Sequence, residues 1–537
     1  MSIRHADENA EATVVTLYDT TLRDGTQREG MSLSVEDKLR IAMKLDLLGV
    51  RYIEGGFPGS NPKDIEFFER ARDLRLEQAI ISAFGSTRRK GVAAADDPGL
   101  KSLLDTGCSA LCIVGKTWDL QVTEAIGATL DQGIEMARDS VAYLKSQGRT
   151  VFFDAEHFFD GYNSNPDYAV AVCQAAADAG ADAIVLCDTN GGMLPADIQR
   201  IVTDVHARVN APLGIHTHND SGCAVANSLV AVTAGCTQVQ GTINGYGERT
   251  GNADLISIIG GLVLKMGDDC ITRDQLRLLT EVSHFVAETA NLNPNAQAPY
   301  VGASAFAHKG GLHASATGKL AGAYEHVDPA SVGNLARVVV SELAGRASLT
   351  MKAAELGIDL SGEQAAAVLD EIKELEYHGY SFEAADASLS IMLQKRLGTF
   401  EPAFTLESFR VIADKREDGR VATEATIKIH VSGHRYIATA EGNGPVNALD
   451  KALRIAIGRF YPQLANMTLD DYKVRVLEDK KGTGAVTRVL IDTKDAETSW
   501  GTVGVSENII EASWEALVDS VEYGLGRSTR SGGESES

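Results

Sequence analysis

Over the first half of the chain, short apolar runs alternate with longer amphipathic stretches, a rhythm that predicts β-strands followed by α-helices. The predicted strands are Val14–Tyr18, Tyr52–Phe57, Ala79–Phe84, Ala110–Val114, Val151–Phe153, Ala183–Cys187, Leu213–Ile215 and Gln238–Ile243. The predicted helices include Ser34–Leu48, Pro62–Leu74, Gln121–Ser146, Pro166–Ala179, Pro195–Val209 and Gly222–Ala234. Eight strands, each followed by a helix or a long loop, are typical of a (β/α)8 TIM barrel, which needs about 250 residues. A doubly wound open sheet is the alternative, but no glycine-rich dinucleotide turn follows the first strand.

The second half of the chain has a different pattern. Residues 285–400 alternate a glycine-rich loop with Ala-, Glu- and Leu-rich stretches such as Gly362–His378, which predicts a helical connector after a barrel domain at 13–284. Residues 401–526 contain a weak repeat that reads β-β-β-α twice and predicts an α+β domain whose two sheets share a core. Residues 527–537 are rich in Ser, Gly and Arg, so we expect a disordered tail.

Composition narrows the class of protein. A chain of 537 residues is too long for one core, and its net charge of −24 argues against a basic surface for nucleic acid or anionic membrane. The N-terminus lacks an apolar signal core, and no run is long and apolar enough to span a bilayer. Seven cysteines, none beyond residue 270 and none in a C-x-x-C pair, do not form a disulfide framework across the chain. We therefore expect a cytoplasmic protein with reduced thiols.

Ionisable side chains follow six of the eight predicted strands. They include Asp24 after the first strand, Glu54 after the second, Asp154 and Glu156 after the fifth, Asp188 after the sixth, His216 and His218 on the seventh, and Glu248 and Arg249 after the eighth. A single acidic residue in such a place is more often a helix N-cap. Because the carboxyl ends of barrel strands meet at one rim, the whole set predicts a functional site there.

His216 and His218 are separated by one residue, so they project to the same side of a strand. With Asp24 they would offer two nitrogens and one carboxylate oxygen to a divalent cation and leave coordination positions open for substrate or water. Asn252, in the glycine-rich loop after the eighth strand, could add an amide oxygen. The alternative is a polar strand end whose histidines bind backbone or carboxylate groups.

Three further side chains suit chemistry at a metal-bound carbonyl. Arg23 could neutralise charge that develops on the carbonyl oxygen, with a structural ion pair as the alternative. Glu156 is a candidate general base, because burial raises the pKa of a carboxylate; the alternatives are a partner of a metal ligand and a core ion pair. Thr189 could donate a hydrogen bond to a substrate carboxylate, with an N-cap as the alternative. These groups fit a metal-bound α-keto acid that is either attacked by a carbanion or cleaved to release one.

Three motifs stand in order along the chain: Leu17–Arg28 (LYDTTLRDGTQR), His216–Asp220 (HTHND) and Gly245–Asp254 (GYGERTGNAD). Together they resemble the signatures of the 2-isopropylmalate, homocitrate and citramalate synthase family. The resemblance covers nearly the whole chain, because the C-terminal repeat is similar to the regulatory dimerisation domain of that family. Within the family, Ile53–Asp64 and Ala307–His313 are most similar to the citramalate synthase branch.

The resemblance implies roles for individual residues. Asp24, His216, His218 and Asn252 match the ligands of a divalent metal, usually Mg²⁺, Mn²⁺ or Zn²⁺. Arg23 matches the arginine that polarises the keto oxygen, Thr189 the threonine that holds the keto-acid carboxylate, and Glu156 the glutamate implicated in deprotonating the methyl group of acetyl-CoA. His313 and Tyr324 match connector residues that complete the site from the partner subunit of a homodimer, with His308 as a competing histidine.

The implied reaction condenses acetyl-CoA, pyruvate and water to (R)-citramalate and CoA, at the start of a pyruvate route to isoleucine, with feedback by an amino acid such as isoleucine on the C-terminal domain. 2-Isopropylmalate synthase, acting on 2-ketoisovalerate in leucine synthesis, is the alternative, followed by homocitrate synthase. One methylene in the pocket changes binding by only about 1–3 kcal/mol, so the motifs do not separate these keto acids. An enzyme like hydroxymethylglutaryl-CoA lyase would lack the C-terminal repeat, and a catalytically silent amino-acid sensor would lack the acid–base residues of the rim.

Overall fold

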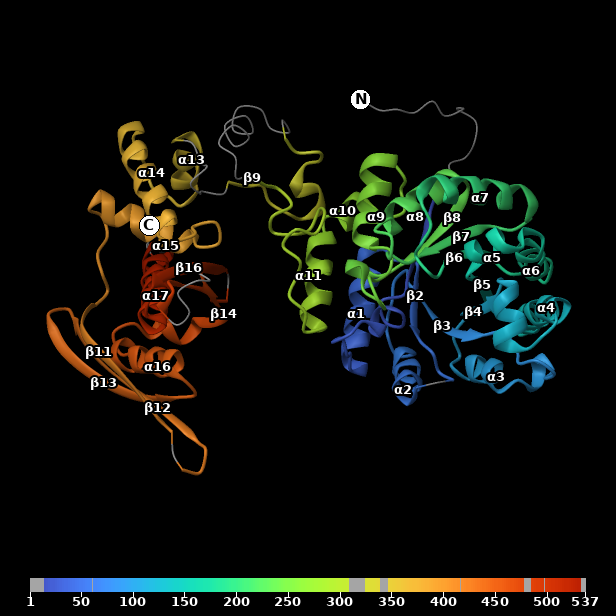
Figure 1. Cartoon of the computed structure of the whole chain (residues 1–537), viewed down its shortest axis with the longest axis horizontal. Helices are drawn as coiled ribbons and strands as arrows, with labels where there is room; N and C mark the ends of the chain where they lie inside the picture. Colours follow the sequence, from blue (N-terminus) through green and yellow to red (C-terminus); the bar gives the residue numbers. More distant parts are fainter. Residues whose placement is uncertain are drawn as a thin grey trace. The chain divides into compact units, whose positions relative to one another are not determined.

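The computed structural model describes residues 14–59, 61–308, 324–338, 346–415, 417–477, 484–496 and 498–532. The described residues form two compact units (Figure 1). The first contains the residues up to 306 together with 325–336, and the second contains 307–308, 324 and the residues from 337 onwards. The predicted connector, residues 285–400, is therefore divided between the two units.

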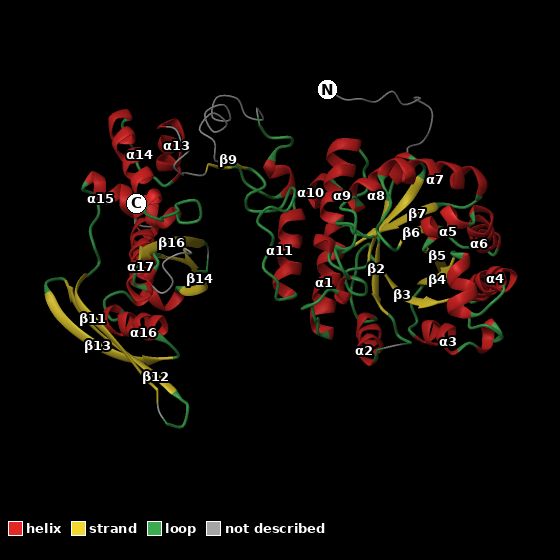
Figure 2. Cartoon of the chain, viewed as in Figure 1, coloured by secondary structure: helices red, strands yellow, loops and turns green. Residues whose placement is uncertain are grey.

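The first unit is built around a closed barrel of parallel strands in sequential order, with helices on its outside (Figure 2). The strands are β1 (Thr16–Asp19), β2 (Tyr52–Gly56), β3 (Ile80–Ser86), β4 (Ala110–Lys116), β5 (Thr150–Glu156), β6 (Ala183–Asp188), β7 (Leu213–Thr217) and β8 (Cys236–Gly241). The predicted (β/α)8 barrel is confirmed. Several strands extend further at their carboxyl ends than predicted, so that Glu156 and His216 lie within strands.

The helices of this unit are α1 (Val35–Leu48), α2 (Pro62–Ala71), α3 (Pro98–Asp105), α4 (Leu130–Ser146), α5 (Phe158–Ser164), α6 (Pro166–Asp178), α7 (Pro195–Arg208), α8 (Ala224–Thr233), α9 (Leu255–Gly261), α10 (Arg273–Leu276) and α11 (Leu279–Thr289). Ser34 begins α1 with a capping box, in which its side chain accepts from the backbone N–H of Asp37. The prediction of one helix over 121–146 is wrong. Gln121–Ile126 forms a π-helix that ends at Gly127, whose φ of 64° is left-handed, and Thr129 then caps α4.

Alternation of side chains along the strands separates two cores. Outward-facing residues such as Ile113 and Ile215 pack in the main cluster that also contains the surrounding helices. Inward-facing aromatic rings fill part of the barrel interior: the Phe152 ring lies 5.5 Å from that of Tyr18 and 4.8 Å from that of Tyr52 between centroids. This packing fills the barrel, so polar side chains gather at the carboxyl ends of its strands.

The second unit contains a short parallel pair, three connector helices and the C-terminal repeat. Its elements are β9 (Ala307–His308), β10 (Arg337–Val338), α13 (Arg346–Glu355), α14 (Gly362–Tyr377), α15 (Asp386–Leu397), β11 (Thr405–Lys415), β12 (Val421–Val431), β13 (His434–Gly442), α16 (Pro445–Ile457), β14 (Thr468–Val476), β15 (Thr487–Lys494), β16 (Ser499–Ser506) and α17 (Ile509–Gly532). The predicted β-β-β-α repeat is confirmed, with two antiparallel sheets, β11-β12-β13 and β14-β15-β16. One core contains Ile427 and Leu453 of the first repeat and Ile491 and Leu517 of the second, so the predicted shared core is also confirmed.

The connector helices pack directly on the second repeat. Val503 of β16 belongs to the same buried cluster as Leu369 of α14 and Leu389 of α15. The Ser388 hydroxyl donates to Asp519 Oδ2 at 2.7 Å and accepts from the backbone N–H of Val503 at 3.0 Å. The helices and the repeat domain therefore share both a core and buried hydrogen bonds.

The expectation of a disordered tail from residue 527 is wrong for residues up to 532. Helix α17 continues to Gly532. Adding a residue to an existing helix costs much less free energy than nucleating a new one, and α17 is already fixed in the core by Leu517 and Val521. Among the helices that the structure describes, none combines the length and apolar character needed to cross a membrane.

Candidate active site

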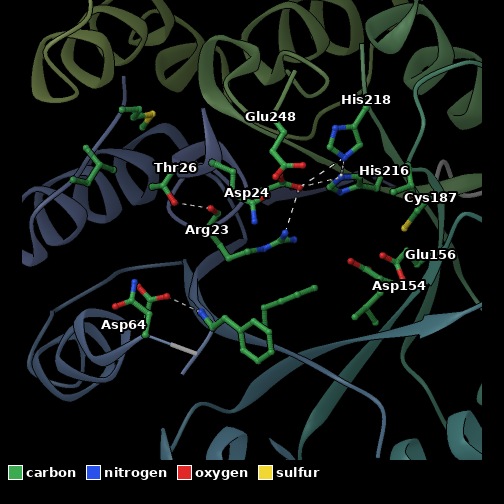
Figure 3. A pocket seen from close by; sticks show the side chains of 18 of the residues that line it. Arg23, Asp24, Thr26, Asp64, Asp154, Glu156, Cys187, His216, His218 and Glu248 are labelled. Carbon is green, nitrogen blue, oxygen red and sulfur yellow. Dashed lines mark hydrogen bonds and ion pairs between the residues drawn. The ribbon is translucent and has the colours of Figure 1, made fainter. Parts of the chain in front are cut away.

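A cavity of about 590 Å³ opens at the carboxyl ends of the barrel strands (Figure 3). Nine of the residues singled out from the sequence line it: Arg23, Asp24, Asp154, Glu156, Thr189, His216, His218, Glu248 and Arg249. The structure therefore brings these side chains together at one cavity, while their functional roles stay predictions. The cavity also extends along the loops that follow β1 and β2, where Leu33, Asn61 and Lys63 form part of its wall.

Asp24, His216 and His218 point toward one another at one side of this cavity (Figure 3). Asp24 Oδ2 lies 3.4 Å from His216 Nε2 and 3.9 Å from His218 Nε2, and the two histidine Nε2 atoms are 3.4 Å apart. All three side chains are buried. Three donor atoms that converge in this way form a set that could hold a divalent cation.

Asn252 is placed beside this set by the loop that follows β8. Its backbone forms an isolated β-bridge with His218, and its Nδ2 donates to the carbonyl of Tyr246 at 3.0 Å. Gly247 must be glycine, because its φ is 153° and a Cβ there would lie 2.2 Å from Asn252 Nδ2. The buried Oδ1 of Asn252 has no hydrogen-bond partner within the described part of the chain. An unpaired buried oxygen next to His218 fits the fourth ligand of a cation.

A cation needs an ionised carboxylate and neutral imidazoles; the pKa values of Asp24 and His218 suit this, whereas His216 would release a proton on binding. Burial alone would raise the pKa of Asp24, but the Arg23 guanidinium and the two histidines outweigh it and hold that pKa well below its usual range. Burial, followed by the neighbouring charge of His216, lowers the pKa of His218 to about 4. Burial would also lower the pKa of His216, but its hydrogen bond with Asp24 raises it.

Arg23 is held from three sides. Its Nε donates to Glu54 Oε1 at 2.6 Å, its Nη1 lies 3.4 Å from Asp24 Oδ2, and its guanidinium lies over the Phe84 ring at 3.9 Å from the centroid. Tyr18 donates its hydroxyl hydrogen to the other Glu54 oxygen at 2.8 Å. Burial would lower the pKa of Arg23, but Glu54 and Asp24 raise it. Arg23 is thus both a member of an ion pair and part of the cavity wall.

Glu156 differs from its prediction. Its side chain is 24% exposed rather than buried, because it lies at the last position of β5, on the cavity wall, where it forms an ion pair with the Lys116 ammonium at the end of β4. The expected burial of Glu156 is therefore wrong, and its carboxylate contacts an ammonium group at the cavity wall instead.

Thr189 lies in the cavity wall directly after β6. Its Oγ1 accepts from the backbone N–H of His157 at 2.8 Å, an arrangement that leaves the hydroxyl hydrogen to donate into the cavity. The N-cap alternative is wrong, because α7 begins at Pro195 and its N-cap is Leu194.

The two connector residues remain predictions. His313 lies outside the described residues. Tyr324 is 50% exposed and belongs to the second compact unit, where its ring centroid lies 6.4 Å from that of His308.

One residue next to the site, Gln240, was not singled out from the sequence. Gln240 of β8 is fully buried, and its Oε1 lies 2.9 Å from His216 Nδ1. Its Nε2 donates to Asp154 Oδ1 at 2.9 Å, and burial raises the pKa of Asp154 to about 6. The available signal was the pair Gln238 and Gln240, polar residues two apart in a strand predicted to be buried. Glu248, which follows β8, also reaches toward Asp24 (Figure 3).

Comparison with known proteins agrees with this arrangement. A family model described as HMGL-like matches residues 14–286, one described as homocitrate synthase post-HMGL domain-like matches 300–379, and one described as LeuA allosteric (dimerisation) domain matches 383–525. The chain is 54% identical over 518 residues to the (R)-citramalate synthase of Geobacter sulfurreducens, with 96% of this chain and 98% of that protein covered. The chain belongs to the (R)-citramalate synthase family.

Other members of the (R)-citramalate synthase family are similar over the same length. The protein of Streptomyces coelicolor is 53% identical, with 95% of this chain and 96% of that protein covered. The 2-isopropylmalate synthase of Methanocaldococcus jannaschii is 32% identical, with 94% of each chain covered. Similarity to relatives of both names therefore extends over nearly the whole chain.

Proposed function

We propose that the chain is an acyltransferase that condenses acetyl-CoA with pyruvate to give (R)-citramalate and CoA. The observation that carries this proposal is full-length similarity: five relatives named (R)-citramalate synthase are 45–54% identical over 95–96% of the chain. Two relatives named 2-isopropylmalate synthase or probable 2-isopropylmalate synthase are 32% identical over 94% of it.

Asp24, His216, His218 and Asn252 would hold a divalent cation, with Mg²⁺ or Mn²⁺ as the proposed metal and Zn²⁺ as the alternative. The support is the convergence of three buried donor atoms and the unpaired Asn252 oxygen, as seen within the described residues. Carboxylate and amide oxygens suit Mg²⁺ and Mn²⁺, whereas paired imidazoles also suit Zn²⁺. When bound, such a cation supplies Lewis-acid polarisation of a carbonyl oxygen.

Arg23 and Thr189 would orient pyruvate. The contacts of Arg23 with Glu54 and Phe84 fix its guanidinium in the cavity wall, from which it can donate to the keto oxygen as negative charge develops there. The Thr189 hydroxyl would donate to the carboxylate of the keto acid. A donor fixed before the reaction stabilises developing charge without reorganisation at the moment of bond formation.

Glu156 would act as the general base. It would take a proton from the methyl group of acetyl-CoA, and the methyl carbon would then bond to C2 of pyruvate while the keto oxygen gains a proton and becomes a hydroxyl. Water would hydrolyse the thioester and release the CoA thiol. Lys116 forms an ion pair with Glu156 at the cavity wall, which supports a fixed position for this carboxylate. His313 and Tyr324 of the partner subunit are proposed to complete the site.

The repeat domain belongs to a family described as an allosteric dimerisation domain, and this supports a homodimer that responds to an effector. We propose isoleucine, the end product of the implied route, as that effector. Isoleucine would have to bind two states of the chain with different affinity in order to change turnover.

The test is thiol release from acetyl-CoA with pyruvate, 2-ketoisovalerate or 2-oxoglutarate as acceptor, each with and without EDTA. We expect release with pyruvate that EDTA abolishes and that added Mg²⁺ or Mn²⁺ restores. Preference for 2-ketoisovalerate would leave the proposed site and reaction type unchanged and would change only the assigned keto acid. A pocket discriminates between such acceptors by only about 1–3 kcal/mol per methylene. Absence of release with any acceptor would overturn the proposal.

A further inference from the structure

The two histidines of the proposed cation site differ in the hydrogen bonding of Nδ1, the ring nitrogen that faces away from the site. Nδ1 of His216 lies 2.9 Å from Gln240 Oε1. Nδ1 of His218 is buried and has no hydrogen-bond partner among the described residues. The fold therefore supplies a dedicated partner to one histidine, and that partner is itself held by a carboxylate.

The orientation of the Gln240 amide follows from its two neighbours. Its Nε2 lies 2.9 Å from Asp154 Oδ1, and a carboxylate oxygen requires a donor, so the NH₂ group must face Asp154. The carbonyl oxygen of the same amide must then face His216, and Nδ1 of His216 must carry the hydrogen. The opposite arrangement would place the Gln240 carbonyl against the Asp154 carboxylate, two acceptors at hydrogen-bond distance with no hydrogen between them.

Burial makes this chain of contacts strong and specific. Gln240 and Asp154 are buried on β8 and β5, and Gln240 is the backbone register partner of His216 on β7. Water has little access to take the place of either partner, and an unpaired polar group here would be costly. These contacts, from Asp154 on β5 through Gln240 on β8 to His216 on β7, are called the relay below. They connect side chains that are far apart in the sequence.

We propose that Gln240 and Asp154 are positioning residues that fix His216 as the Nδ1–H tautomer and hold its Nε2 lone pair toward the cation. The inference rests on the proposed cation site but not on the identity of the keto acid. A ligand histidine whose second nitrogen donates to a fixed acceptor is a stronger and better oriented ligand. Gln240 is not part of the cavity wall and acts only through His216, whereas Asp154 also lines the cavity.

The test measures binding of Co²⁺ alone to the full chain, by equilibrium dialysis and by the visible absorption of the bound ion, after chelator treatment. Gln240→Met keeps the volume of the side chain and removes both hydrogen bonds; we expect its Co²⁺ affinity to fall about 10- to 100-fold, the usual effect of losing such a partner. Turnover should be largely recovered at saturating metal. We expect a small change in kcat and a larger increase in the metal concentration that gives half of the maximal activity.

Gln238→Met is the matched control. Gln238 is a buried glutamine of the same strand two residues earlier, and its Oε1 has no hydrogen-bond partner among the residues that the structure describes. We expect this substitution to leave Co²⁺ affinity unchanged. An equal loss in both variants would mean that packing, not the relay, is responsible, and would overturn the proposal.

A second pair of variants tests the far end of the relay and covers the case in which Gln240→Met fails to fold. Asp154→Asn retains an oxygen that can accept from Gln240, whereas Asp154→Leu does not, so the leucine variant should lose more affinity. Adding Gln240→Met to Asp154→Leu should cause little further loss, because both act through one histidine. Unchanged Co²⁺ affinity in Asp154→Leu would overturn the proposal, whereas failure of the wild-type chain to bind Co²⁺ would overturn the cation site itself.

Discussion

At the residue scale, the site depends on how firmly each functional group is oriented before substrate arrives. Arg23 illustrates this, because Glu54, Asp24 and the Phe84 ring fix its guanidinium together. A planar guanidinium can donate to a carboxylate through Nε and stack on an aromatic ring at the same time, whereas an ammonium group cannot. The charge of Arg23 is therefore only part of its contribution.

Arg23→Lys should keep the positive charge and still lower turnover by about 10²- to 10³-fold, the usual effect of losing one oriented donor to a developing oxyanion. The measurement is kcat and KM for pyruvate, and kcat is expected to fall more than KM rises. Arg51→Lys is the control, because Arg51 donates to the backbone carbonyl of Gln78 and lies over the Tyr52 ring but is not part of the cavity wall. Near-normal kcat in Arg23→Lys would mean that charge alone suffices.

The sequence predicted the residue types of the site better than their surroundings. Asp24, His216 and His218 follow from period-2 alternation and from the convergence of strand ends, both of which are local rules. The ion pair of Glu156 with Lys116 and the contact of Gln240 with Asp154 join different strands, so they depend on barrel register, which a single sequence does not fix. Asn252 was predictable because its loop is rich in glycine.

At the scale of elements, the strands and most helices were predictable because their hydrophobic period is regular. The exceptions are positions where a single residue or the end of a helix determines the local backbone conformation. Gly127 adopts a left-handed conformation that interrupts the predicted helix over 121–146. The last turns of α17 have a polar composition, but they continue a helix that is already anchored in the core.

The contact between α15 and α17 has a consequence for stability. Burial raises the pKa of Asp519 on α17 to about 6, so its carboxyl remains protonated in the folded chain at pH values where it is ionised in the unfolded chain. As pH rises from about 4 to about 6, the unfolded chain releases this proton first, and the free energy of unfolding falls. Above pH 6 the full loss is present, on the order of 2–3 kcal/mol.

Asp519→Asn should therefore stabilise the second unit increasingly as pH rises from about 4 to about 6, and by a constant amount at higher pH, because the amide has no proton to release and can still accept from Ser388. The measurement is thermal unfolding followed by tryptophan fluorescence, to which Trp500 and Trp514 of this unit contribute. Asp370→Asn is the control, since the Asp370 side chain is 81% exposed. A stability difference that does not change with pH would contradict the assignment.

At the scale of the whole molecule, the compact units do not follow the boundaries that composition suggests. The sequence predicted a connector at 285–400 and a separate domain from 401, because the pattern of predicted elements changes there from helices and loops to a β-β-β-α repeat. The structure instead buries Leu369, Leu389 and Val503 in one cluster, and Arg488 of β15 donates to the backbone carbonyls of Gly379 and Tyr380. The boundary between the units depends on contacts between segments more than 100 residues apart in the sequence. The local pattern of apolar and polar residues gives no information about such contacts.

A chain that ends at residue 400 should therefore lose more than the repeat domain. Removing Val503 and Leu490 would expose apolar surface on α14 and α15, and we expect rapid cleavage within 346–400 in limited proteolysis. A chain that ends at residue 336 retains the first unit without those helices and is the matched comparison. Equal protease resistance of 346–400 in the full chain and in the chain ending at 400 would contradict this prediction.

The joint core of the connector helices and the second repeat also determines where natural or engineered recombination can succeed. An exchange of the regulatory region between relatives with a crossover near residue 400 would pair Leu369 and Leu389 of one parent with Val503 of the other, and their shapes have not been selected together. A crossover before residue 346 would transfer helices and repeat domain as one inherited block. Descent by module shuffling in this family should therefore leave its breaks between the barrel and α13, with α13–α17 sharing a single ancestry.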